Sequence, residues 1–225
     1  ASLRDLDHVV GNLLKQLYAD GVLKNTIVVV TSDHGELLGE HGHFEHRFVL
    51  NEPLIHVPLL IRYPDKVKPG RVPHPVSTTS VFATLASLLG LPTPATLGPV
   101  TSLTADPTPV VSEFTATPPA LVRTTKKAYP DVDFSPWFIT RTAVRSDNWK
   151  WMSASDGSQT LFDVVADPGE QNDLFALQEA TATELSKALE TFRSARSAYD
   201  PSLRSDDDTP RGLSDDKESL EQLRA

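Results

Sequence analysis

Most of the side chains that could do chemistry lie in one stretch, residues 26–58. Five of the chain's seven histidines fall between His34 and His56, and Asp33 stands directly before the first of them. A neighbouring carboxylate and imidazole can both reach one cation, and Gly35 relieves crowding behind them. The alternative is a polar turn in which Asp33 caps the next element. On the dipeptide alone, both interpretations stay open.

An apolar run comes directly before this pair and must position it. Residues 27–30 read Ile-Val-Val-Val, and a β-branched run without polar alternation predicts a strand buried on both faces, as in a parallel sheet. Ligand crevices of open α/β sheets lie beyond the carboxyl ends of the strands, where Asp33 and His34 would emerge. The glycine-punctuated residues 37–46 are expected to form a loop, and residues 59–62 a second strand.

Composition narrows the class of protein. A chain of 225 residues with 39% hydrophobic and 23% charged residues is ordinary for a globular protein of one large or two small domains. The net charge of −9 argues against non-specific binding to nucleic acid. No apolar run approaches the ~20 residues that span a bilayer, so no membrane segment is expected in this chain. The absence of cysteine excludes disulfides and thiol catalysis within it.

Periodicity and turn signals predict the remaining elements. Helices are expected from residue 3 to a stop at Gly21, from residue 81 to a stop at Gly90, and over residues 178–199. The predicted strands cover residues 110–114, 138–145, 149–153 and 159–164, with a tight turn at Asp156-Gly157 between the last two. Residues 92–120 read as a long surface connection containing the first of these strands, and residues 201–225 as an acidic flexible tail.

Several spaced motifs together resemble one family. The chain contains S-D-H-G-E-x-x-G-E-H-G, a basic residue thirteen positions after Asp33, and then E-x-x-x-x-V-P-L-x-I-R. Further on it contains D-G-S-x-x-L-F-D-V-x-x-D-P-G-E-x-x-D-L. This combination, which covers nearly the whole chain, is similar to the sulfatases of the alkaline phosphatase superfamily.

The resemblance implies roles for particular residues. Asp33 and His34 match metal ligands that hold a divalent cation against the sulfate: calcium first, with Mg²⁺, Mn²⁺ or Zn²⁺ as alternatives. His46 matches a catalytic, substrate-binding position that contacts the sulfate and helps to protonate the leaving oxygen. His41 is a further substrate-binding candidate, for which holding the loop is an equal alternative. Three basic side chains could face the leaving group or be ordinary strand surface: Arg141, Arg145 and Lys150.

The family nucleophile is a formylglycine made within a C/S-x-P-x-R motif, and this chain contains no such motif. The chain is therefore expected to be the C-terminal portion of a sulfatase, with the formylglycine in a missing N-terminal half. The implied fold is α/β. Residues 1–104 would form the C-terminal part of a mostly parallel, helix-flanked sheet with the metal-site loop. Residues 105–200 would form a small antiparallel subdomain with a C-terminal helix, before the tail at 201–225.

The expected function is hydrolysis of a sulfuric ester, and the expected partner is a small-molecule or carbohydrate sulfate ester. Two alternatives remain. One is a phosphoethanolamine transferase or a phosphodiester or phosphonate hydrolase of the same superfamily, since those transferases share the S-D-H-G-E pattern and a histidine at the position of His46. The other is a non-catalytic relict binding domain, which the missing nucleophile favours and the intact Asp33, His34 and His46 oppose.

Overall fold

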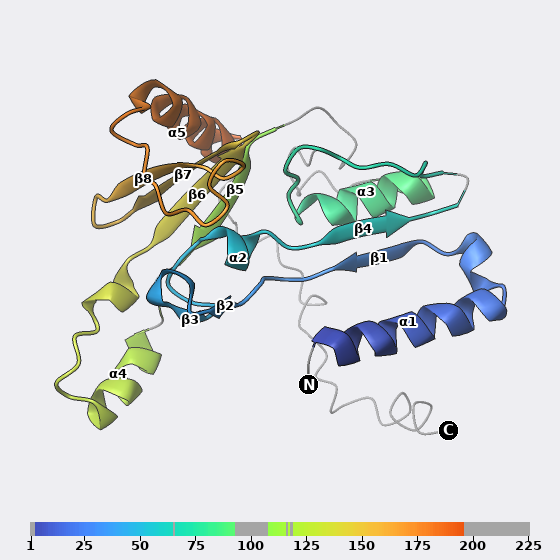
Figure 1. Ribbon diagram of the computed structural model, residues 1–225, viewed down its shortest axis with the longest axis horizontal. Coiled ribbons are helices and arrows are strands. Elements are labelled where there is room, and N and C mark those ends of the chain that lie inside the picture. Colours follow the sequence, from blue (N-terminus) through green and yellow to red (C-terminus); the bar gives the residue numbers. More distant parts are fainter. Residues whose placement is uncertain (1–2, 65, 93–107, 116, 118, 196–225) are drawn as a thin grey trace. The chain divides into compact units, whose positions relative to one another are not determined.

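The computed structural model describes residues 3–64, 66–92, 108–115, 117 and 119–195 (Figure 1). The predicted tail at 201–225 and the predicted boundary at 104–105 lie outside these residues. The helices within them are α1 (Leu3–Ala19), α2 (Glu52–Ile55), α3 (Ser80–Leu89), α4 (Pro119–Ala128) and α5 (Glu179–Ser194). Short 3₁₀ turns are η1 (Val22–Asn25), η2 (Glu40–Gly42) and η4 (Ser135–Phe138).

The strand that leads into the Asp33–His34 pair is β1 (Val28–Thr31), which pairs with β4 (Leu59–Arg62). The pairing is antiparallel, with Val29 opposite Ile61. The prediction of a strand is confirmed, but the expected parallel pairing and burial on both faces are not found among the described residues. The loop and α2 reverse the chain between the two strands. Val28 and Val29 are partly buried, whereas Val30 and Thr31 at the end of β1 are exposed.

A short hairpin follows β1 and carries the histidine-rich loop. Strands β2 (Leu37–Leu38) and β3 (Phe44–Glu45) are antiparallel, and η2 connects them. Leu37 is completely buried and anchors the hairpin. Residues 37–46 therefore form a connection where the sequence predicts a loop. Within it, two pairs of residues form a short antiparallel ladder.

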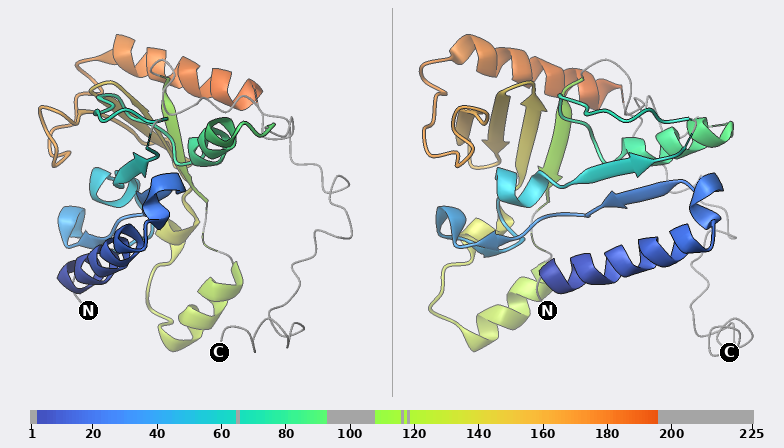
Figure 2. Two further views of the ribbon diagram at one scale, coloured as in Figure 1. Left: turned by 90° about the vertical axis from the view of Figure 1, so that its right-hand side faces the viewer. Right: turned by 45° about the vertical axis from the view of Figure 1, so that its right-hand side comes forward.

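The second half of the chain forms one four-stranded antiparallel sheet (Figure 2). Its order is β5 (Val110–Phe114), β6 (Arg141–Ser146), β7 (Trp149–Ala154) and β8 (Gln159–Asp163). Helix α5 packs on it, and the shared core contains three residues from the sheet and three from α5: Val144, Trp151, Leu161, Ala182, Leu185 and Leu189. The α/β class with a small antiparallel subdomain is thus confirmed.

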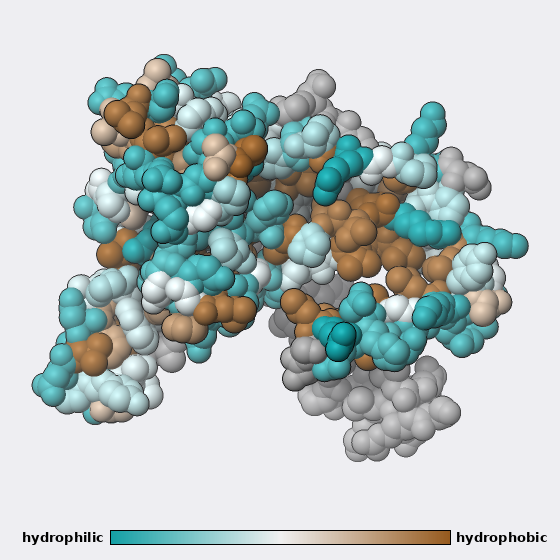
Figure 3. Space-filling view, viewed as in Figure 1, coloured by the Kyte–Doolittle hydropathy of each residue, from teal (hydrophilic) through white to brown (hydrophobic). Residues whose placement is uncertain are grey.

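Apolar side chains also remain at the surface. All the apolar residues of α1 are at least partly exposed, although they recur at helical spacing. Figure 3 shows a second apolar area over β1, β4 and α3, where Leu60, Phe82 and Leu89 are exposed. Within the described part of the chain, every helix is too short or too polar to cross a membrane.

Candidate functional site

Asp33 and His34 follow β1 directly and turn two ligand atoms toward each other. Oδ2 of Asp33 lies 3.8 Å from Nε2 of His34. The Nδ1 atom of His34 lies 2.7 Å from the carbonyl oxygen of Gly35, which can only accept, so Nδ1 carries the proton. Nε2 is then the basic nitrogen. Metal-bound histidines commonly donate their other N–H to a carbonyl in this way, so the pair fits a shared cation.

The carboxylate of Asp33 is held in its ionised form. Its Oδ1 accepts the backbone N–H of His34 at 2.9 Å, and Ser32 Oγ donates to it at 3.3 Å. These bonds, above all the one from the His34 amide, and the neighbouring imidazole lower the pKa of Asp33 below its usual range. The side chain is 85% exposed, so Oδ2 is accessible to a cation from solvent.

His46 lies against the same pair. Its ring stacks on the ring of His34, with centroids 4.4 Å apart and planes 23° apart. Its Nδ1 lies 3.4 Å from Oε2 of Glu36, a contact that favours a proton on that nitrogen. The sequence-based candidates Asp33, His34 and His46 are therefore brought together, although they are separated by a loop. Ser32 and Glu36 were not predicted as site residues, but both belong to the S-D-H-G-E motif.

Gly35 has a steric reason to be glycine. Its N–H donates to the carbonyl oxygen of Leu54 in α2 at 2.7 Å. A Cβ atom at this position would lie 2.0 Å from the carbonyl oxygen of Pro53, which is backbone and cannot give way cheaply. Helix α2 therefore packs directly against the residue that follows the Asp33–His34 pair.

The loop that carries His46 contains several left-handed backbone conformations. Three residues other than glycine have positive φ: His41 at 53°, Glu45 at 68° and Phe48 at 74°. Such conformations cost free energy and persist only where the surroundings fix them. Phe48 is fixed by ring contacts to Trp137 and Phe114 of the second half of the chain, with centroids 5.1 and 6.0 Å apart.

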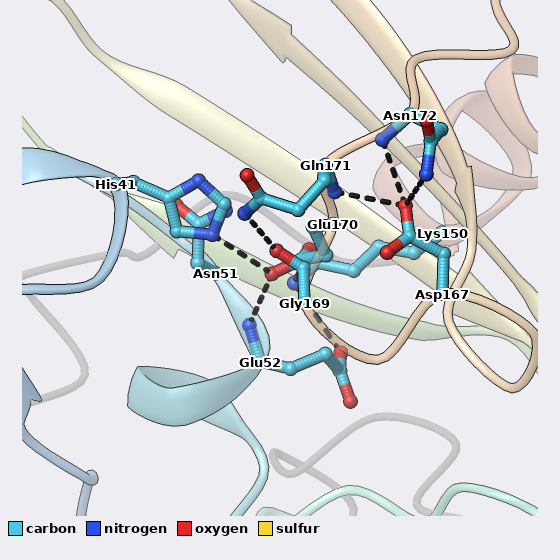
Figure 4. A network of polar contacts seen from close by, with 9 residues as sticks. All are labelled: His41, Asn51, Glu52, Lys150, Asp167, Gly169, Glu170, Gln171 and Asn172. Carbon is cyan, nitrogen blue, oxygen red and sulfur yellow. Dashed lines mark hydrogen bonds and ion pairs between the residues drawn. The ribbon is translucent and has the colours of Figure 1, made fainter.

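His41 lies in a polar network with Asn51 and Glu170 (Figure 4). Its Nε2 accepts a hydrogen bond from Nδ2 of Asn51 at 3.2 Å and lies 4.0 Å from Oε2 of Glu170. These contacts favour the alternative that His41 holds the loop. His56 pairs with Glu52 at 3.2 Å and is otherwise exposed.

Lys150 is fully buried, so it is not an ordinary strand surface residue. Its side chain has no exposed area and faces Glu170 and Glu52. Arg145 is partly buried, and this desolvation lowers its pKa from the ordinary value. An open cavity of about 600 Å³ lies between α4 and residues 131–138, lined by residues such as Val122, Lys126 and Phe138, and it includes none of the site candidates.

Chemically, the site offers one carboxylate, one basic imidazole nitrogen and a second imidazole stacked beside them. Among the described residues, no group of three or more His, Cys, Asp or Glu side chains is placed to hold a metal ion. Asp33 and His34 thus offer two candidate ligands.

Comparison with known proteins decides the family. Residues 1–91 match the family model described as Sulfatase. Over 206 residues the chain is 30% identical to an N-acetylglucosamine-6-O-sulfatase of Bacteroides thetaiotaomicron, covering 89% of this chain and 36% of that relative. The chain belongs to the sulfatase family. Sulfatases generally depend on a divalent cation, which agrees with the chemistry of the Asp33–His34 pair.

Solved structures agree with this membership. One, determined in complex with its substrate D-glucosamine-2-N,6-O-disulfate, has a TM-score of 0.68 and 26% identity, over 90% of this sulfatase chain and 41% of that chain. A phosphonate monoester hydrolase from Silicibacter pomeroyi shares the fold with a TM-score of 0.67 at 23% identity, over 88% and 40% of the two chains. The chain spans about a third of the length of the curated relatives it matches.

Proposed function

We propose that this chain contributes a metal and sulfate site to a sulfuric ester hydrolase. The observation that carries the proposal is the convergence of Asp33 Oδ2 and His34 Nε2 at 3.8 Å, with the His46 ring stacked on His34. Family membership supplies the reaction class, and one relative that matches over 89% of the chain is an N-acetylglucosamine-6-O-sulfatase.

In this proposal Asp33 and His34 hold the cation. Calcium suits the carboxylate oxygen, whereas the imidazole also admits Mg²⁺, Mn²⁺ or Zn²⁺. When bound, the cation attracts the sulfuryl oxygens and stabilises the charge that develops on them. The hydrogen bonds that lower the pKa of Asp33 keep its carboxylate ionised for this task.

His46 would contact the sulfate and protonate the leaving oxygen as the S–O bond breaks. For this step His46 would carry a proton on both ring nitrogens: the one on Nδ1 would face Glu36 at 3.4 Å, and the one on Nε2 would pass to the leaving oxygen. Stacking on His34 keeps the His46 ring in direct contact with one of the two proposed cation ligands. His41 has a supporting role in the proposal, because it contacts Asn51 and not the site pair.

The substrate class we propose is a sulfated carbohydrate. This rests on two similar proteins, an N-acetylglucosamine-6-O-sulfatase and a protein solved in complex with its substrate D-glucosamine-2-N,6-O-disulfate. The nucleophile, a formylglycine in this proposal, would come from polypeptide that carries a C/S-x-P-x-R motif. In this proposal residues 1–104 contain the cation ligands, and residues 105–200 form the antiparallel subdomain that supports them.

The 225-residue chain is expected to bind but not to turn over sulfate esters, because it contains no C/S-x-P-x-R motif. Binding of a sulfated N-acetylglucosamine, in the presence of Ca²⁺, should shift the NMR signals of His46 in the wild type and not in Asp33→Asn. Measurable release of sulfate by the purified chain would contradict the assigned division of the site. A phosphonate ester that shifts His46 more strongly than the sulfate would favour the phosphonate hydrolase alternative, for which the present support is the shared fold.

A further inference from the structure

Lys150 places a positive charge inside the antiparallel sheet. Its Nζ lies 2.7 Å from Oε1 of Glu170 and 3.3 Å from Oε1 of Glu52. The shorter contact is not aligned as a hydrogen bond, so it acts as an ion pair. Burying an ammonium and a carboxylate is costly, and apolar residues of similar volume often stabilise a protein as well or better. Fold stability therefore does not explain why these charges are buried.

The turn that carries Glu170 is built to point its side chain inward. Glu170 adopts φ of +50°, a conformation that is costly for a residue other than glycine. Asp167 fixes the turn, because its Oδ2 accepts the backbone N–H groups of Gln171 and Asn172, both at 2.8 Å. Figure 4 shows the Glu170 carboxylate between Lys150 and the start of α2.

Glu170 holds the beginning of α2. Its Oε2 accepts the backbone N–H of Glu52, the first residue of that helix, at 2.8 Å, across 118 positions of sequence. This bond satisfies one of the amide groups that a helix start leaves without an intrahelical partner. The Glu52 side chain then returns to Lys150, so backbone and side chain of one residue are both tied to the same ion pair.

Helix α2 in turn holds the residue behind the cation ligands. The Leu54 carbonyl accepts the Gly35 amide at 2.7 Å, and the Pro53 carbonyl occupies the space where a Gly35 side chain would be. A shift of α2 is therefore transmitted to Gly35 by both a hydrogen bond and a direct contact. Asp33 and His34 immediately precede Gly35.

We propose that Lys150 and Glu170 are positioning residues for the Asp33–His34 pair. The chain of contacts runs from Lys150 to Glu170, from Glu170 to α2, and from α2 to Gly35. The buried charges specify where α2 lies, and α2 sets the geometry in which Oδ2 and Nε2 face each other. The inference rests on the proposed function only in treating Asp33 and His34 as cation ligands.

The test compares Glu170→Ala with Glu113→Gln in the 225-residue chain. Glu113 forms a half-exposed ion pair with Arg193 of α5 at 3.0 Å in the same subdomain, so it is the control for the loss of a carboxylate outside the proposed chain of contacts. Amide exchange at Gly35 is measured by NMR, and Mn²⁺ affinity by titration calorimetry. Glu170→Ala should speed Gly35 exchange and weaken Mn²⁺ binding, each by about tenfold, while amides within β6–β8 keep their protection.

A second variant keeps the test decisive if Glu170→Ala does not fold. Lys150→Met combined with Glu170→Met removes both buried charges together, which proteins tolerate better than removal of one. It still deprives the Glu52 amide of its acceptor and should speed Gly35 exchange similarly. Exchange and affinity equal to those of Glu113→Gln would overturn the positioning role. A wild-type chain that binds no Mn²⁺ would instead contradict the proposed function, and Gly35 exchange would still decide the positioning role.

Discussion

At the scale of single residues, the site depends on atoms that the backbone holds in place. His34 is directed by a hydrogen bond to the Gly35 carbonyl, and Asp33 by the His34 amide. Both partners are backbone groups of the same short segment. The proposed ligand pair can therefore be predicted from the motif S-D-H-G-E. The stacking of His46 on His34 could not be predicted from spacing, because it depends on a loop with three left-handed residues.

Gly35→Ala should damage the site through packing alone. The added Cβ would meet the Pro53 carbonyl oxygen at 2.0 Å, so α2 or the ligand segment must move. We expect a loss of about 3 kcal/mol in the free energy of unfolding. Urea denaturation measures it. The control is Gly11→Ala in α1, where a Cβ has no atom within 4 Å and should stabilise by about 1 kcal/mol. Equal effects of the two substitutions would show that α2 does not press on Gly35.

At the scale of elements, the antiparallel subdomain follows closely from sequence and the α2 region does not. Alternating strands and the Asp156-Gly157 turn predict β6, β7 and β8 because each element is specified by its neighbours in sequence. Helix α2 is only four residues long and contains Pro53, and its first amide is held by Glu170. A contact across 118 positions leaves no local signal, although D-P-G-E marks the turn that supplies it. Helix α4 was likewise not predicted.

The β7–β8 turn should depend on pH through Asp156. Its Oδ1 accepts the Ser158 hydroxyl at 2.7 Å and the Ser158 amide at 2.9 Å, and these bonds lower the pKa of Asp156 below 3.8. Because the folded pKa is depressed, the stabilisation is present above the unfolded pKa and is lost as the pH falls through the folded pKa.

Carboxyl NMR titration of the wild type should therefore give a midpoint for Asp156 below 3.8, and Ser158→Ala should move it upward. Asp156→Ala should be less stable than the wild type at neutral pH, and the difference should shrink in acid. A midpoint that Ser158→Ala leaves unchanged would show that the hydroxyl does not hold this carboxylate.

At the scale of the whole molecule, residues from both halves of the sequence contact each other around the candidate site. The proposed cation ligands and His46 lie before residue 50, but Phe48 contacts Trp137 and Phe114, and Glu52 contacts Lys150 and Glu170. The second half thus acts as a support for the first. Sequence motifs indicated the family and marked both the S-D-H-G-E segment and the D-P-G-E turn. They did not predict the contacts between the two halves, because those contacts arise only when distant segments pack.

The most direct test of the proposed site is to determine where a cation binds. Mn²⁺ broadens NMR signals of nearby nuclei, so it can be titrated into the isotopically labelled 225-residue chain while the histidine ring signals are recorded. We predict that His34 broadens first, that His46 follows because its ring centroid lies 4.4 Å from that of His34, and that Asp33→Asn abolishes both effects. Broadening that spares His34, or that persists unchanged in Asp33→Asn, would contradict the assignment of this pair as the cation site.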